Sequence, residues 1–188
     1  WWLEFRRVLF RSYILVSAHR EENIDNDENF KSITDALNKI AATYDMPVIY
    51  STHPRSWKKI EEKGIKFHKN IRQLKPFGFY DYNKLQKDSF CVLSDSGSLA
   101  EESNIMEFAG VSIRTSTERP EAIDKGSIIL GGITTDSITQ AIEIITTQKS
   151  LGEKTVKAHD YTDINVAIKV VNIIQGYTSV INNFIWRK

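Results

Sequence analysis

The sequence predicts an α/β fold built on a doubly wound parallel sheet. Short apolar runs rich in β-branched residues alternate along the chain with longer amphipathic stretches. Such alternation is typical of parallel strands covered by helices on both faces. The 188 residues, 41% of them hydrophobic, are enough for one core, and no repeat or low-complexity linker divides them. We therefore expect a single main domain.

The first half of the chain is expected to supply three strands and three helices. Apolar residues recur at spacings of three and four between Phe30 and Tyr44, which predicts an amphipathic helix capped by Asn26 or Asp27. Gly64 is expected to end the next helix. The predicted strands are 13–16, 47–50 and 71–74, and the predicted helices are 30–44, 56–63 and 80–87.

The second half repeats this alternation and ends in an apolar tail. Pro120 suits the first turn of a helix, and Gly131 closes the last strand. Residues 177–188 are apolar enough to pack against another surface, so the domain is expected to span 13–176. The predicted strands are 90–93, 111–113 and 127–130, and the predicted helices are 98–108, 120–125, 136–147 and 164–174.

Composition excludes several classes of protein. The formal net charge of +1 provides no basic field for nucleic acid. No apolar stretch approaches the roughly 20 residues of a membrane helix, so no membrane partner is expected. The lone cysteine, Cys91, lies in an apolar run and is expected in the core, which fits a reduced, cytoplasmic setting.

Residues 1–12 are interpreted as a non-native lead-in. They show neither helical nor strand periodicity, and residues 4–12 resemble the translation of a common sequencing-library adapter. The alternative is a natural basic amphipathic segment. On the first interpretation the reading frame is cut at this point, and an upstream domain is expected to be missing.

Candidate functional residues are those that directly follow a predicted strand, because ligands of doubly wound sheets bind outside the carboxyl ends of the strands. Four such segments are polar: 17–23, 51–55, 94–102 and 114–121. Three of them contain arginine and two contain histidine. Since the strands are predicted to be parallel, we expect these side chains to converge at one edge of the sheet.

The segment with the clearest mechanism is Ser96-Gly97-Ser98, where a strand is expected to turn into a helix. Free N–H groups at a helix start favour an anion, and glycine allows a phosphate to approach the backbone closely. Glu102 lies one helical turn further and suits the two hydroxyls of a ribose. The alternative is an ordinary serine cap beside a solvated glutamate pair.

Other polar side chains have open assignments. Arg119 precedes a helix start and suits a diphosphate, with a surface pair to Glu118 or Glu121 as the alternative. His19 and His53 each fit a phosphate donor, a general acid or a structural histidine. A metal site from His19, His53, Asp95 and Glu102 finds no support in their spacing, so no metal is expected. The aromatic group Phe77, Phe79, Tyr80 and Tyr82 offers a ring for stacking on a base, but rings at this density more often belong to a core.

Taken together, three motifs resemble the non-hydrolysing UDP-N-acetylglucosamine 2-epimerases. They are His-Arg-Glu at 19–21, Ser-Asp-Ser-Gly at 94–97 followed by Glu101-Glu102, and Thr-Glu-Arg-Pro-Glu-Ala at 117–122. The resemblance runs from about Tyr13 to the C-terminus. It implies the C-terminal half of a two-domain glycosyltransferase-B-type fold, in which two Rossmann-like domains face each other across the active-site cleft.

The resemblance also implies roles for individual residues. The serines and glycine at 96–98 would hold the diphosphate, Glu102 the ribose, and Tyr82 would lie near the uridine. His19 and Arg119 would contact the phosphates or the leaving group as catalytic residues. The full set implied to bind substrate is Ser96, Gly97, Ser98, Glu102, Arg119, His19, Tyr82 and Phe77.

Two positions depart from the usual family pattern. Ser98 stands where a second glycine is usual, and Phe77 where a glutamine is usual. Together with segments 17–23 and 74–79, these changes resemble the branch that acts on UDP-2-acetamido-2,6-dideoxy-L-talose. That branch makes UDP-N-acetyl-L-fucosamine for capsule or O-antigen polysaccharide.

The implied reaction is inversion at C2 of a UDP-N-acetylhexosamine, by elimination and re-addition of UDP. The carboxylates that handle the C2 proton would belong to the missing N-terminal domain, against which a tail helix at 177–188 would pack. The resemblance implies no cofactor, a UDP-sugar substrate and a homodimer of the full-length protein. The alternatives are the UDP-sugar-binding half of a glycosyltransferase and a non-catalytic nucleotide-binding module.

Overall fold

A computed structural model describes residues 13–153 and 155–187. The expectation for residues 1–12 therefore lies outside the described residues. The chain divides into two compact units, one ending at Ala158 and the other beginning at His159. Each unit is described separately below.

The first unit is organised around six parallel strands in the order β3-β2-β1-β4-β5-β6. Their bounds are β1 Ile14–Ser17, β2 Val48–Ser51, β3 Ile71–Leu74, β4 Cys91–Ser94, β5 Gly110–Ser112 and β6 Ile128–Leu130. The central strand β1 pairs with β2 on one side and with β4 on the other. Strand order thus reverses direction between β1 and β4, and this arrangement confirms the predicted doubly wound α/β fold.

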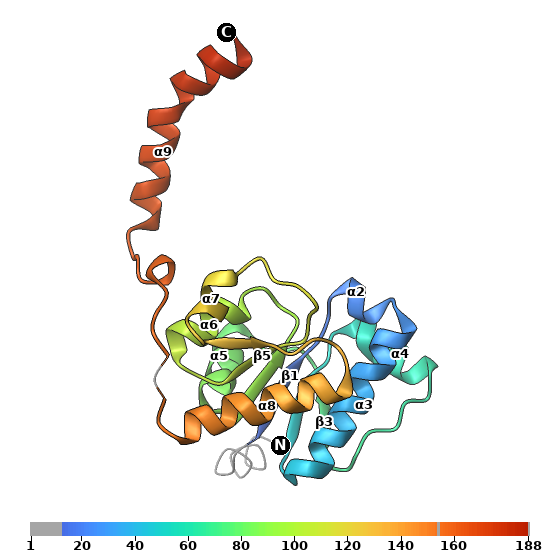
Figure 1. Cartoon of the computed structure of the whole chain (residues 1–188). Helices are drawn as coiled ribbons and strands as arrows, with labels where there is room; N and C mark the ends of the chain where they lie inside the picture. The colour runs from blue at the N-terminus through green and yellow to red at the C-terminus, as the bar shows by residue number, and fades with distance from the viewer. Residues whose placement is uncertain (1–12, 154, 188) are drawn as a thin grey trace. The chain divides into compact units, whose positions relative to one another are not determined.

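Helices cover both faces of the sheet (Figure 1). The helices are α2 Glu21–Ile24, α3 Asp27–Tyr44, α4 Pro54–Glu62, α5 Phe79–Asp88, α6 Leu99–Met106, α7 Pro120–Asp124 and α8 Thr135–Ser150. On one face, α3 and α8 bury a stripe of branched side chains against Ile14 and Val16. Residues that alternate with these along β1, such as Leu15, are equally buried on the other face. Each fully buried Leu or Ile contributes about 1.5–3 kcal/mol, so burial on both faces fixes the register of the strands.

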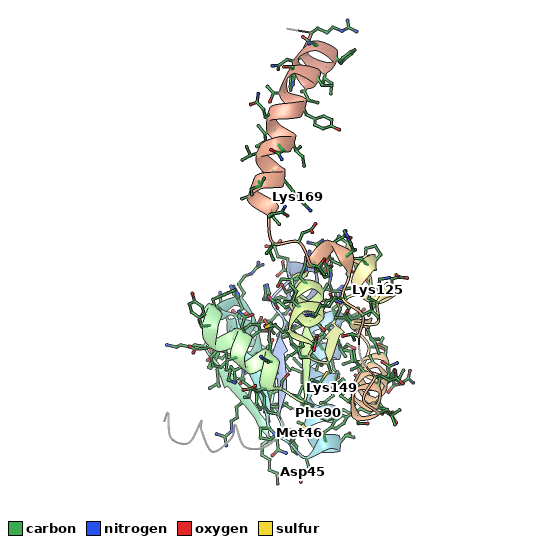
Figure 2. All side chains as sticks on the ribbon, turned by 90° about the vertical axis from the view of Figure 1, so that its left-hand side faces the viewer. Asp45, Met46, Phe90, Lys125, Lys149 and Lys169 are labelled. Atoms are coloured by element: carbon green, nitrogen blue, oxygen red, sulfur yellow. The ribbon has the colours of Figure 1, made fainter. Side chains whose placement is uncertain are left out.

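The helix α3 shows why local signals predicted this fold well. The side chain of Asn26 accepts hydrogen bonds from the N–H groups of Glu28 and Asn29, which confirms it as the cap. The helix ends at Tyr44 because Asp45 adopts a left-handed conformation with φ of 45°. At the opposite edge from the carboxyl ends, Met46 and Phe90 precede β2 and β4 and pack against the core (Figure 2).

The second unit contains a short 3₁₀ helix at His159–Tyr161, the helix α9 at Val166–Ile181 and a π-helical turn at Asn182–Trp186. The helix predicted for 164–174 is thus longer than expected. The expected boundary between residues 176 and 177 falls inside α9. No residue of α9 is buried.

Among the helices of the described residues, none has both the length and the apolar character needed to cross a membrane.

Candidate functional site

The candidate site lies at the carboxyl edge of the sheet, where β1 and β4 run side by side. Ser17 at the end of β1 is in register with Ser94 at the end of β4. The loops that follow these two strands leave towards opposite sides, which opens a crevice between them. The strands β2 and β5 end at the same edge, so the segments that follow them begin there, as the sequence predicted.

Asp95 ties the two central loops together. Its carboxylate is fully buried and accepts hydrogen bonds from the backbone N–H groups of His19, at 2.9 Å, and Arg20, at 2.8 Å. The amide of Asn23 also donates to it, at 3.1 Å. The Nδ1 atom of His19 lies 3.4 Å from the same carboxylate. The loop carrying His19 is therefore fixed to the start of the Ser96–Ser98 turn.

The turn itself leaves backbone donors unused. The N–H groups of Gly97 and Ser98 donate to no acceptor in the described part of the chain. Ser98 makes no side-chain cap, so the alternative of an ordinary serine cap is not what the geometry shows. Its hydroxyl instead lies 3.0 Å from that of Ser96. A Cβ atom added to Gly97 would meet nothing within 4 Å, which leaves open space in front of the turn.

Both glutamates of the first turn of α6 are engaged by side chains from other elements. Glu102 accepts a hydrogen bond from the buried Gln86 of α5, with 2.5 Å between Nε2 and Oε2. Glu101 accepts from Nε of Arg119, at 2.6 Å. The second carboxylate oxygen of Glu101 is buried without a hydrogen-bond partner in the described residues. The side chain of Glu102 is thus held by a residue of α5, and the side chain of Arg119 is held by a residue of α6.

Of the two glutamates considered as partners of Arg119, Glu118 is bound by a different arginine. Glu118 instead forms a two-pronged ion pair with the buried Arg114, at 2.7 and 2.8 Å. The Arg114 guanidinium lowers the pKa of Glu118 to about 2. Arg119 directly precedes α7, and its backbone N–H donates to the hydroxyl of Thr117 while its side chain reaches Glu101.

The aromatic residues before and within α5 separate into two groups. Phe79 and Tyr80 are 74% and 85% exposed, so the expectation that this group belongs to the core is wrong for them. Phe77 is half-buried in the loop that follows β3. Tyr82 is half-buried and faces Ser17 and Ser94 at the ends of the central strands. Burial raises the pKa of Tyr82 to about 12, so it stays a neutral hydrogen-bonding ring.

His53 caps α4 by accepting from the N–H of Arg55, and its ring lies 6.3 Å from that of His19. The described residues contain no cluster of three or more His, Cys, Asp or Glu side chains suited to a metal ion. The structure thus gives His53 a capping contact, while His19 stays exposed at the crevice.

The arrangement combines unused N–H donors and one arginine with carboxylates set one helical turn away. Unused donors at a helix start attract an anion such as a phosphate, and carboxylates accept hydrogen bonds from hydroxyls. Sequence reasoning identified these residues but missed Gln86. A glutamine in the middle of a helix carries no local signal, because its role depends on Glu102 from a different helix.

Comparisons with known proteins identify relatives of this chain. Residues 3–175 match the family model described as UDP-N-acetylglucosamine 2-epimerase. A UDP-N-acetylglucosamine 2-epimerase of Methanocaldococcus jannaschii is 34% identical over 146 residues, which are 76% of this chain and 40% of that protein. The chain therefore spans less than half the length of this relative.

Solved structures show the same relationship. A crystal structure of the Methanocaldococcus jannaschii UDP-GlcNAc 2-epimerase, in complex with UDP-GlcNAc and UDP, matches 93% of this chain and 48% of its own. The TM-score is 0.80 and the identity 29%. An Escherichia coli heptosyltransferase with ADP matches 78% of this chain at a TM-score of 0.53 and 11% identity, which shows a shared fold alone. With a family model matching most of its length, the chain belongs to the UDP-N-acetylglucosamine 2-epimerase family.

Proposed function

We propose that this chain is the UDP-binding half of an enzyme that inverts C2 of a UDP-N-acetylhexosamine. The observation that carries the proposal is the turn at Ser96–Ser98, whose N–H groups at Gly97 and Ser98 remain unused in the crevice between β1 and β4. Arg119 and the exposed His19 flank it. A UDP-GlcNAc 2-epimerase of similar fold, from Methanocaldococcus jannaschii, was crystallised with UDP-GlcNAc and UDP.

In the proposed reaction UDP leaves C1 and later returns. No carbonyl group acidifies the C2 proton, so the route runs through a glycal-like intermediate that is protonated from the other face. Departure of UDP builds negative charge on the β-phosphate. Fixed donors aimed at such charge each lower a barrier by about 3 kcal/mol, and in this chain those donors are the turn, Arg119 and His19.

The acids and bases for the C2 proton are assigned to the part of the relatives that this chain does not span. The glutamates near the turn have other tasks in the structure: Glu101 holds Arg119, and Glu118 holds Arg114. Glu102 is proposed to bind ribose. We also propose that the tail at 177–188 packs on the part of the full-length protein that this chain does not span, and that the full-length protein is a homodimer.

The test is proton exchange in heavy water by the full-length protein. Incubation with its UDP-sugar is expected to place deuterium at C2 of the recovered nucleotide sugar. Transfer of the sugar to an acceptor without exchange would assign the protein to the glycosyltransferases instead. UDP binding with neither reaction would indicate a non-catalytic module.

We assign the substrate to the L-talo branch on Ser98 and Phe77, and the product to bacterial surface polysaccharide. The same assay, run in parallel with UDP-N-acetylglucosamine and with UDP-2-acetamido-2,6-dideoxy-L-talose, tests the branch. Faster exchange with the dideoxy sugar is the expected result, and faster exchange with UDP-N-acetylglucosamine would overturn this assignment.

A further inference from the structure

The side chain of Gln86 is buried inside the domain and contacts the candidate site through Glu102. It is 1% exposed on α5, four residues after Tyr82, so both side chains lie on one face of that helix. Its amide nitrogen donates to Glu102 Oε2 at 2.5 Å, across the boundary between α5 and α6. Glu102 itself is only half-buried and borders the crevice.

Chemistry fixes the orientation of this amide. A carboxylate offers acceptors only, so the nitrogen end of Gln86 faces Glu102 and the oxygen end faces away. That oxygen, Oε1, is buried and has no hydrogen-bond partner in the described part of the chain. Burying a polar atom without a partner destabilises a fold.

A purely structural role does not account for this residue. Methionine or leucine would fill the same space without leaving a buried oxygen unpaired. The amide is useful at this position because it supplies a donor to Glu102. A charge-assisted hydrogen bond holds one carboxylate oxygen and so orients the other.

We propose that Gln86 is a positioning residue that sets Glu102 to accept hydrogen bonds from the ribose hydroxyls of UDP. This inference rests on the proposed UDP-binding function and deepens it. Gln86 acts through Glu102 and does not touch the nucleotide. Substitution of Gln86 should therefore weaken only the contacts to the ribose hydroxyls. A general destabilisation of the domain would instead weaken the contacts to every part of the nucleotide.

The experiment compares UDP with 2′-deoxy-UDP by titration calorimetry on the 188-residue chain. Wild type is expected to prefer UDP by about tenfold, the loss that follows removal of a hydrogen bond to a charged group. Gln86→Met removes the donor at similar volume, and Gln86→Asn withdraws it by one methylene. Both variants are expected to weaken UDP binding about tenfold and to weaken 2′-deoxy-UDP binding less, because that ligand keeps only its 3′-hydroxyl for Glu102.

Tyr13→Phe is the matched control. The buried hydroxyl of Tyr13 donates to the carbonyl of Leu85 on the same helix, next to Gln86 but away from Glu102. This variant is expected to lower stability and to keep the preference for UDP. Circular dichroism identifies any variant that is unfolded. If Gln86→Met is unfolded, the comparison is made with Gln86→Asn, which keeps a polar side chain.

The outcomes separate the two claims. Wild type that fails to bind UDP would overturn the proposed function and this inference with it. Wild type that binds UDP and 2′-deoxy-UDP equally would overturn only the ribose role of Glu102 and Gln86. A preference that survives both Gln86 substitutions, or equal weakening of both ligands, would show that Gln86 is structural. Further loss when Gln86→Met is added to Glu102→Ala would also contradict action through Glu102.

Discussion

Asp95 and Gly97 illustrate two opposite ways in which single residues shape this site. Asp95 is fully buried and holds the backbone of residues 19–20, so it is needed for the local fold. Gly97 has no protein atom near its absent Cβ and does not adopt the left-handed backbone that favours glycine. The fold therefore has room for a side chain at 97, and we expect a substitution there to affect a bound ligand more than the fold.

Gly97→Ala is expected to separate binding from stability. The free energy of unfolding should stay within about 0.5 kcal/mol of wild type or rise slightly, because alanine loses less conformational entropy on folding. Affinity for UDP should fall about tenfold, since the added methyl group crowds the diphosphate against fixed backbone. Urea unfolding and UDP titration measure the two effects.

Gly176→Ala is the matched control, because Gly176 also has open space around its Cβ and lies in α9. It should leave UDP affinity unchanged. Unaltered UDP binding in Gly97→Ala would mean that the diphosphate does not sit against this turn.

Asp27 joins two helices through charge. It is the first residue of α3, and its carboxylate contacts Lys59 of α4 at 2.7 Å and Lys63 at 2.6 Å. Hydrogen bonds from these two lysines lower the pKa of Asp27 from 3.8 to about 2. Because the folded-state pKa is depressed, the stabilisation is present above pH 4 and is lost as the pH falls towards 2.

Asp27→Asn should therefore flatten the decline in stability between pH 4 and pH 2, as measured by thermal unfolding across that range. Lys58→Gln is the control, because Lys58 lies on α4 beside Lys59 but pairs with Glu62 and not with Asp27. An unchanged pH profile in Asp27→Asn would show that the ion pair contributes nothing to holding α3 against α4.

The helix α9 carries an apolar face that is uncovered. Four apolar residues recur at spacings of three and four and are 46–61% exposed: Val170, Ile173, Ile174 and Tyr177. Asn172, Gln175 and Ser179 lie on the opposite face. A face of this kind promotes association when it has no partner.

Ile174→Lys is expected to reduce self-association of the chain, and Asn172→Lys on the polar face is expected to leave it unchanged. Sedimentation velocity over a concentration series measures both. If the two substitutions act equally, association depends on net charge and not on the apolar face.

Across the whole molecule, the sequence predicted what local patterns control. The six strands follow from the alternating apolar runs, and α3 follows from its periodicity and from Asn26. The ion pair of Arg119 with Glu101, and the hydrogen bond of Gln86 with Glu102, join residues 18 and 16 positions apart on different elements. Sequence spacing carries no information on such tertiary contacts. The exposure of Phe79 and Tyr80 was missed for the same reason.

We expect this chain to bind UDP at the crevice between β1 and β4 and to show no epimerase activity on its own. Binding is expected in the high-micromolar to millimolar range, a binding free energy of about 4–6 kcal/mol, because the proposed opposite wall of the cleft belongs to the part of the relatives that this chain does not span, so that water screens the charges. Turnover is expected to be undetectable without the proton-transferring carboxylates of the other half. A cavity of about 600 Å³ lies at the amino edge of the sheet, and its lining includes Lys125 and Lys149 together with Glu107 and Glu153.

The most direct measurement is a titration of the isotopically labelled chain with UDP, followed by amide NMR, with uridine as the comparison. UDP is expected to shift the amide signals of Gly97, Ser98 and His19. Uridine, which lacks the diphosphate, is expected to shift them much less. Shifts confined to Lys125 and Lys149, or equal shifts with both ligands at the turn, would contradict this expectation.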